Sequence, residues 1–114
     1  MSKNRDISLY LEDILDSINA IEDYVKNVDF DTFYSDRKTY SATIREFEII
    51  GEAVGKIIDY LEKDSSVNWR DIKDFRNFLI HEYFGVDFEI VWQTIEEDLP
   101  KLKVSINRLI KESR

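Results

Sequence analysis

The sequence has 114 residues, of which 43% are hydrophobic and 35% are charged, a balance typical of a globular protein and not of a disordered one. It contains no cysteine, which excludes disulfide bonds and thiolate metal sites and favours a reducing, cytoplasmic environment. The formal net charge of −8 argues against binding of nucleic acid over the whole surface, because phosphates would be repelled, so any RNA must bind at a local positive site.

The first predicted helix covers about residues 6–27. Acidic side chains fall on one face, which we expect to be solvated. Apolar residues recur at spacings of three and four on the other face, as in an amphipathic helix: Ile7, Leu11, Ile14, Leu15, Ile18, Ile21 and Val25. Residues 28–35 hold three aromatic side chains, and we expect them to form a connector that packs inward.

The second predicted helix covers about residues 36–63. Its apolar stripe consists of Tyr40, Ile44, Phe47, Ile50, Val54, Ile57, Ile58 and Leu61. Gly51 and Gly55 lie inside it, and because each glycine weakens a helix interior by about 1 kcal/mol, we expect them to permit a close helix crossing. Residues 51–56 also resemble a phosphate-binding loop, but the spacing of the glycines is one residue short, which favours helix packing.

The third predicted helix starts after Asn68, an expected N-cap, and runs to about Phe84, with Gly85 as its stop. The fourth begins near Asp87, and Pro100 is expected either to kink it or to begin a fresh helix. No apolar run is long enough for a signal peptide or a membrane span. The pattern predicts an all-α fold, an antiparallel four- to five-helix bundle, with residues 1–114 forming a single domain.

The candidate functional residues lie in the third predicted helix, which holds the single histidine of the chain. Asn77 and His81 are four apart and therefore neighbours on one face, and Arg76 and Tyr83 are seven apart and nearly aligned. Arg76 and His81 differ by about 140° around the axis and about 7.5 Å along it, so a long arginine could reach a phosphate held near the imidazole. The spacing alone is equally compatible with a structural role, in which His81 is hydrogen-bonded within the core and Arg76 is exposed to solvent. One histidine without cysteine argues against a metal site.

A family resemblance adds to this reading. The third helix contains a pattern that resembles the Arg-x4-His-x-Tyr signature of the HepT-like HEPN proteins, with Arg76, His81 and Tyr83 at the three named positions. These proteins are the toxin halves of two-gene toxin–antitoxin modules. Asn77 matches the polar residue that commonly follows the arginine of that signature.

The resemblance extends over most of the chain and keeps the same order. Residues 45–53 resemble the second-helix segment of the family, residues 68–70 its entry to the motif helix, and residues 86–102 its last helix. One departure is Asn68, which stands where a proline often precedes the tryptophan.

The resemblance implies a homodimeric helical bundle that acts as a metal-independent endoribonuclease toxin and needs no cofactor. It implies catalytic roles for Arg76 and His81 with Asn77 in support. It also implies that Tyr83 is modified with AMP by a cognate nucleotidyltransferase antitoxin, which would neutralise the toxin. RNA is the implied substrate, and no membrane association is expected.

The chemistry is consistent with a dimer, because RNA supplies its own nucleophile, the 2′-hydroxyl, and two copies of His81 could act as base and acid while Arg76 stabilises the added charge. Two other functions remain open from the sequence. The chain could be a non-catalytic helical subunit of a nucleotidyltransferase complex that binds a nucleotide or a partner, or a purely structural dimer.

Overall fold

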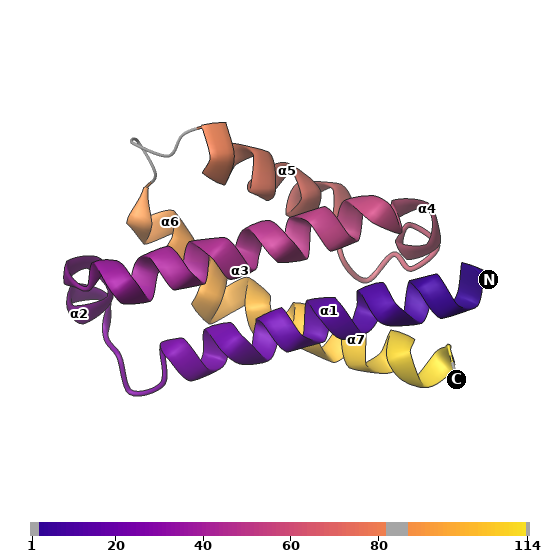
Figure 1. Ribbon diagram of the computed structural model, residues 1–114, viewed down its shortest axis with the longest axis horizontal. Helices are drawn as coiled ribbons and strands as arrows, with labels where there is room; N and C mark the ends of the chain where they lie inside the picture. The colour runs from indigo at the N-terminus through magenta and orange to yellow at the C-terminus, as the bar shows by residue number, and fades with distance from the viewer. Residues whose placement is uncertain (1–2, 82–86, 114) are drawn as a thin grey trace.

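The computed structural model describes residues 3–81 and 87–113, and every regular element in those two ranges is helical, which confirms the predicted all-α class (Figure 1). The elements are α1 (Lys3–Tyr24), α2 (Phe30–Ser35), α3 (Arg37–Lys56), α4 (Ile58–Leu61), α5 (Trp69–His81), α6 (Phe88–Gln93), the π-helical turn η2 (Thr94–Asp98) and α7 (Leu99–Glu112). α1 packs antiparallel against both α3 and α7, and α5 packs antiparallel along α3.

Helix α1 ends at Tyr24, three residues before the predicted end. Asn27 adopts φ 60°, a left-handed conformation that asparagine tolerates better than most residues and that turns the chain out of the helix. The connector that follows contains the short helix α2, capped by Asp29, whose carboxylate accepts a hydrogen bond from the Thr32 backbone N–H at 2.8 Å. The prediction that this segment packs inward holds for Phe33, which is fully buried, but not for the exposed Tyr34.

The single helix predicted over residues 36–63 is wrong near its end, because the chain breaks at Ile57. This residue has φ −124° and ψ 27° and separates α3 from the one-turn helix α4. Both Ile57 and Leu61 are buried, so the break keeps two apolar side chains in the core while the chain turns towards α5. Residues 51–56 lie within α3, which agrees with helix packing and not with a phosphate-binding loop.

Pro100 lies in the first turn of a new helix, as one of the two sequence interpretations predicted. The helix predicted to begin near Asp87 does so as α6, and Asp87 caps it by accepting hydrogen bonds from two backbone N–H groups. The chain then passes through η2, where the Leu99 N–H bonds to the Thr94 carbonyl, and α7 begins at Leu99. Proline has no N–H to donate to the carbonyl four residues earlier, and its ring clashes with that carbonyl. The wider π-helical turn before Pro100 accommodates both effects.

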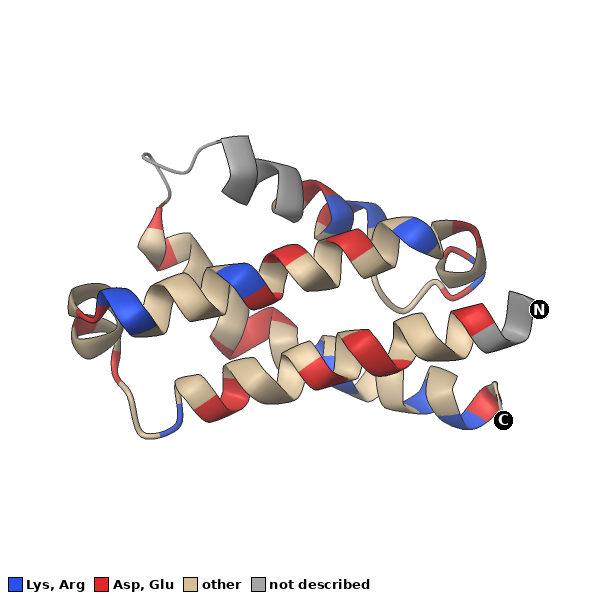
Figure 2. Cartoon of the chain, in the orientation of Figure 1, with Lys and Arg blue, Asp and Glu red and all other residues tan. Residues whose placement is uncertain are grey.

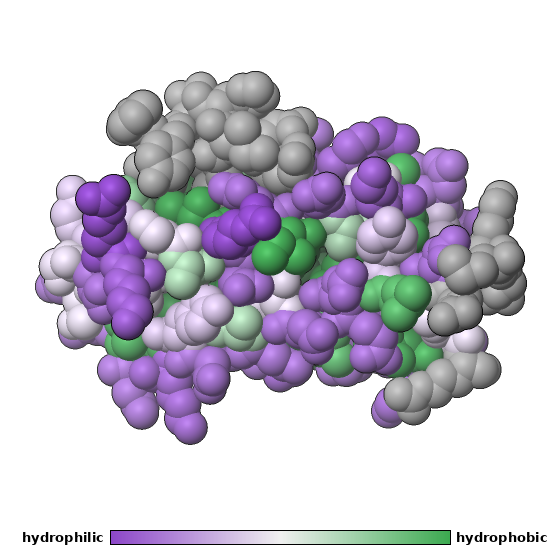
Figure 3. All heavy atoms as spheres, viewed as in Figure 1, coloured by the Kyte–Doolittle hydropathy of each residue, from purple (hydrophilic) through white to green (hydrophobic). Residues whose placement is uncertain are grey.

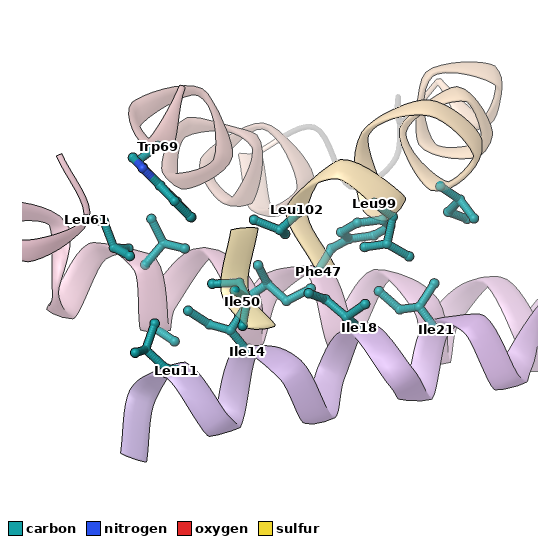
Figure 4. Packing of buried hydrophobic residues seen from close by; sticks show 14 of the residues in the cluster. Leu11, Ile14, Ile18, Ile21, Phe47, Ile50, Leu61, Trp69, Leu99 and Leu102 are labelled. Atoms are coloured by element: carbon teal, nitrogen blue, oxygen red, sulfur yellow. The ribbon is translucent and has the colours of Figure 1, made fainter. Parts of the chain in front are cut away.

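The core lies where α1, α3 and α7 meet, with contributions from α5 and η2 (Figure 4). Its fully buried large side chains are Leu11, Ile14, Ile18, Ile21, Phe33, Ile50, Leu61 and Ile106. Lys103 of α7 also pairs with Glu22 of α1 at 2.6 Å. On the face shown in Figure 3, hydrophilic side chains predominate among the described residues, with scattered apolar ones between them. None of the described helices combines the length and the apolar character needed to span a membrane.

Candidate active site on helix α5

Helix α5 carries the predicted site residues, and its first turn is firmly fixed. Asn68 caps it as predicted, because its side-chain oxygen accepts a hydrogen bond from the Asp71 backbone N–H at 3.2 Å. Trp69 is only 2% exposed, and its indole Nε1 donates to the backbone carbonyl of Asp64 at 3.0 Å. Arg70 donates two hydrogen bonds to the carboxylate of Glu62, at 2.8 and 3.0 Å. The position where α5 begins is therefore set by the loop that precedes it.

That loop is tied in turn to α7 through Asp64. The Asp64 carboxylate accepts hydrogen bonds from the Ser66 hydroxyl at 2.8 Å and from Arg108 at 2.9 Å. Burial favours a higher pKa for Asp64, but the hydrogen bonds from Ser66 and Arg108 outweigh it and lower the pKa below its ordinary value. The ionised carboxylate is thus the form that this network stabilises.

Beyond its first turn, α5 rests on α3. The ring of Phe75 meets that of Phe47 edge-on, with centroids 5.4 Å apart and an interplanar angle of 87°. Nearer the start of α5, the aliphatic stem of Lys73 lies 3.7 Å from the point where a side chain on Gly55 would begin. Helices α3 and α5 therefore pack closely here, as predicted. The crossing does not require glycine at position 55, because 3.7 Å is an ordinary contact distance and alanine would also fit.

The predicted catalytic residues Arg76, Asn77 and His81 occupy the last turns of α5. Their backbone is helical, so the spacing used to place Asn77 and His81 on one face applies. The described side chains are those of residues 6–75 and 87–113, so the roles of these three residues stay predictions. Tyr83, Gly85 and the predicted end of the helix near Phe84 lie outside the described residues.

A cavity of about 350 Å³ opens beside the first half of α5, between α3, η2 and α7. Its apolar walls include Phe47, Ile50, Ile72, Phe75, Leu99 and Leu102. Polar groups also line it: Ser66, Asn68, Asp71, Thr94, Asp98 and Lys101. The sequence did not indicate this cavity, because its walls come from segments up to about half the chain apart and only the packing of α5 against η2 and α7 brings them together.

Charge is unevenly distributed over the helices (Figure 2). Acidic residues predominate on α1, whereas α7 carries four cations, Lys101, Lys103, Arg108 and Lys111, and one acid, Glu112. Two of these cations are paired with acids, Lys103 with Glu22 and Arg108 with Asp64, so neighbouring carboxylates balance part of the positive charge of α7. Across the described ranges, no three His, Cys, Asp or Glu side chains group together in a way that could hold a metal ion.

Comparison with known proteins gives a consistent family. Residues 14–109 match the family described as "Ribonuclease HepT-like". A probable ribonuclease HepT of Thermococcus cleftensis is 43% identical over 103 residues, which cover 90% of this chain and 94% of that protein. A putative RNase of Methanocaldococcus jannaschii is 41% identical over 107 residues, which cover 93% of this chain and 97% of the relative.

A further relative is longer. The protein of Methanocaldococcus jannaschii named as a gamma-glutamylcyclotransferase and putative RNase is 38% identical over 109 residues, which cover 95% of this chain but only 49% of that protein. The chain thus spans about half the length of that relative and nearly the full length of the other two. No solved structure matches the chain.

Proposed function

Because this chain belongs to the HepT-like ribonuclease family, we propose that it is a metal-independent endoribonuclease toxin whose catalytic residues are Arg76, Asn77 and His81. The observation that carries the proposal is that a chain of this ribonuclease family holds the three motif residues on one well-anchored helix. All three residues lie in the last turns of one helix. That helix is anchored at its other end to the preceding loop, which is tied in turn to α7. Rigid support of this kind is what a catalytic arrangement requires.

In the proposed reaction, the 2′-hydroxyl oxygen of RNA attacks the adjacent phosphorus while His81 accepts the hydroxyl proton. The bond from phosphorus to the 5′-oxygen breaks, and that oxygen takes a proton from the His81 of a second copy of the chain. The products are a 2′,3′-cyclic phosphate and a free 5′-hydroxyl. Arg76 stabilises the negative charge that develops on the phosphate oxygens, and Asn77 orients the imidazole or the phosphate.

The reaction needs a base and an acid at the same time, and one imidazole cannot easily serve as both in a single step. The chain contains a single histidine. A homodimer whose two-fold axis passes near His81 solves this problem, because the same residues of both copies then meet at one cleft. The homodimer is therefore part of the proposal and not an independent addition to it.

Tyr83 is the proposed point of control. A cognate nucleotidyltransferase antitoxin would transfer AMP from ATP to the phenolic oxygen of Tyr83, with release of pyrophosphate. The added phosphate brings negative charge and bulk to a position seven residues from Arg76, about two helical turns along a regular helix. An RNA phosphate would then be repelled from the site.

The decisive experiment measures cleavage of RNA by the purified protein in EDTA, with His81→Ala as the test variant. We expect the wild type to produce cyclic-phosphate ends without divalent metal, and His81→Ala to lose cleavage while light scattering reports an unchanged dimer. RNA cutting that persists in His81→Ala would reject the assignment of the histidine.

The net charge of −8 favours one other function, a non-catalytic subunit that binds a nucleotide or a partner protein, because an acidic surface attracts RNA poorly. The same experiment separates the two functions. A wild type that binds a nucleotidyltransferase but leaves RNA intact in EDTA, and also after Mg²⁺ is added, would favour the binding subunit.

A further inference from the structure

The cavity beside α5 lies next to the proposed active site along the same helix. Its α5 lining ends at Phe75, and Arg76 is the next residue. Ile72, which also lines it, precedes Arg76 by one helical turn, or about 6 Å along the axis. A cavity at this distance from a phosphate-binding arginine is within reach of a neighbouring nucleotide of the same RNA strand.

The size and the walls of the cavity suit a flat aromatic ring. Its volume of about 350 Å³ lies at the small end of the range for ligand pockets, so it holds one nucleoside and not a long ligand. Phe47 and Phe75 form an edge-to-face pair in its lining, and Leu99 and Leu102 lie near Phe47 (Figure 4). Contact between nucleic-acid bases and aromatic side chains is a general source of affinity.

The polar groups narrow the choice of base. Asp71 and Asp98 are exposed carboxylates in the cavity lining, and Lys101 adds an exposed ammonium group one turn from Asp98. Carboxylates accept hydrogen bonds from the amino groups of bases, and lysine donates to the O6 and N7 atoms of guanine. Only guanine presents two adjacent donors to a carboxylate, its N1–H and N2 amino group, and also offers O6 and N7 to lysine. Adenine and cytosine place an accepting ring nitrogen, N1 or N3, beside their amino group, and a carboxylate repels that nitrogen. Uracil has no amino group and matches the carboxylates least.

The π-helical turn gives this side of the cavity its shape. Thr94 and Asp98 are its first and last residues, and both line the cavity. π-helical turns are rare and occur often at functional sites. The Thr94 hydroxyl donates its proton to the Ile90 carbonyl at 2.8 Å, so towards a ligand Thr94 can only accept a hydrogen bond, as the Asp98 carboxylate can.

We infer that this cavity binds a base of the RNA strand next to the cleaved phosphate and prefers guanine, with Asp98 and Asp71 accepting from its amino edge and Lys101 donating to its O6 or N7. The inference rests on the proposed ribonuclease function and adds base selectivity to it.

The test measures binding and not cleavage, so that it stands apart from the test of the catalytic residues. The probes are 2′-deoxy trinucleotides of sequence U-X-U, in which X is guanine, adenine, cytosine or uracil. Without a 2′-hydroxyl they cannot be cleaved by the proposed chemistry. For the wild type we expect the guanine probe to bind about tenfold more tightly than the uracil probe, the scale of one good base contact.

Three variants assign the effect to the cavity. Asp98→Asn replaces the carboxylate by an amide of the same size and should reduce the preference for guanine over uracil several-fold. Glu97→Gln is the matched control, since it makes the same change one residue away in η2, outside the cavity lining, and should keep the wild-type preference. Val67→Trp lies in a loop and fills the cavity, so it should weaken binding of the guanine probe.

The outcomes separate this inference from the proposed function. Equal binding of all four probes, no binding of any, or an unchanged preference in Asp98→Asn would overturn the inference even if RNA cleavage depends on His81. Guanine-selective binding that Asp98→Asn removes would support it even if the wild type fails to cleave RNA. If Val67→Trp alters only dimer dissociation, the cavity serves a second copy of the chain and the inference fails.

Discussion

The indole Nε1 of Trp69 donates a hydrogen bond of 3.0 Å to the backbone carbonyl of Asp64, and this bond joins the start of α5 to the loop before it. The side chain of the same aspartate accepts from Arg108 on α7 at 2.9 Å. One residue therefore fixes the start of α5 relative to α7. Because a helix is stiff, fixing its first turn also constrains where its last turns, with Arg76 and His81, can lie.

Trp69→Phe tests the structural importance of this bond. The substitution keeps an aromatic ring but leaves the Asp64 carbonyl without its indole donor, so we expect the free energy of unfolding to fall by about 1–3 kcal/mol. Urea denaturation measures the change. Trp92→Phe is the matched control and should cost less, because its ring contact with Phe33, at a centroid distance of 5.1 Å, survives in part. Equal losses would show that the indole bond contributes little.

Asp64→Asn tests the pH dependence that follows from the lowered pKa of Asp64. A carboxyl whose pKa is lowered by folding contributes stability above its unfolded pKa, about 3.9, and loses it as the pH falls through the lower folded value. At pH 7 we expect the variant to be about 1–2 kcal/mol less stable, a figure reduced because Arg108 is partly exposed. Denaturation at pH 7 and pH 3 should show the difference shrinking at pH 3. A constant difference would contradict the ionic role.

Arg76→Lys tests whether the guanidinium acts on the transition state. Lysine keeps the charge but not the two-pronged hydrogen bonding to a phosphate, so we expect kcat for RNA cleavage to fall by about 10²-fold. Arg45→Lys is the matched control, because it makes the same change on α3, where the Arg45 side chain is 68% exposed and pairs with Glu48. Its cleavage rate should stay within a few-fold of wild type. A wild-type cleavage rate in Arg76→Lys would show that the positive charge at position 76 is sufficient and that the guanidinium geometry is not needed.

Tyr83→Phe tests the proposed modification site. The change removes only the phenolic oxygen, so RNA cleavage should stay within a few-fold of wild type while inactivation by the nucleotidyltransferase and ATP is lost. Mass spectrometry of the peptide containing residue 83 measures the modification, with the wild-type protein as the positive control. AMP found on another residue of the wild type, with Tyr83 unmodified, would reject the assignment.

Ile18→Ala tests the packing of α1 in the core. Ile18 is fully buried, so removing its outer carbons leaves a cavity, and we expect the free energy of unfolding to fall by about 2–5 kcal/mol. Val104→Ala on α7 is the surface control. Val104 is 70% exposed, and its substitution should change stability by less than about 0.5 kcal/mol. Comparable losses in the two variants would mean that Val104 is covered in solution, as in a dimer.

The sequence by itself determined the long helical segments and their apolar faces, but not the short helix α2 or the break at Ile57, because amphipathic periodicity and capping depend on residues close together in the chain. The cap at Asn68 and the start of a helix near Asp87 were predicted correctly for that reason, and a fresh helix with Pro100 in its first turn was one of the two predicted alternatives. The motif from Arg76 to Tyr83 was also evident from local spacing. Its family, though not the roles of its residues, is supported by comparison over most of the chain.

Only the tertiary structure decided the features that depend on distant residues. The break at Ile57 keeps two side chains in a common core, and the anchoring of Trp69 and Arg108 by Asp64 joins the loop before α5 to α7. The cavity between α5 and η2 exists because these elements pack around it. Local patterns cannot encode such relationships, because the free energy that selects them comes from burying side chains of several helices together and not from any one helix alone.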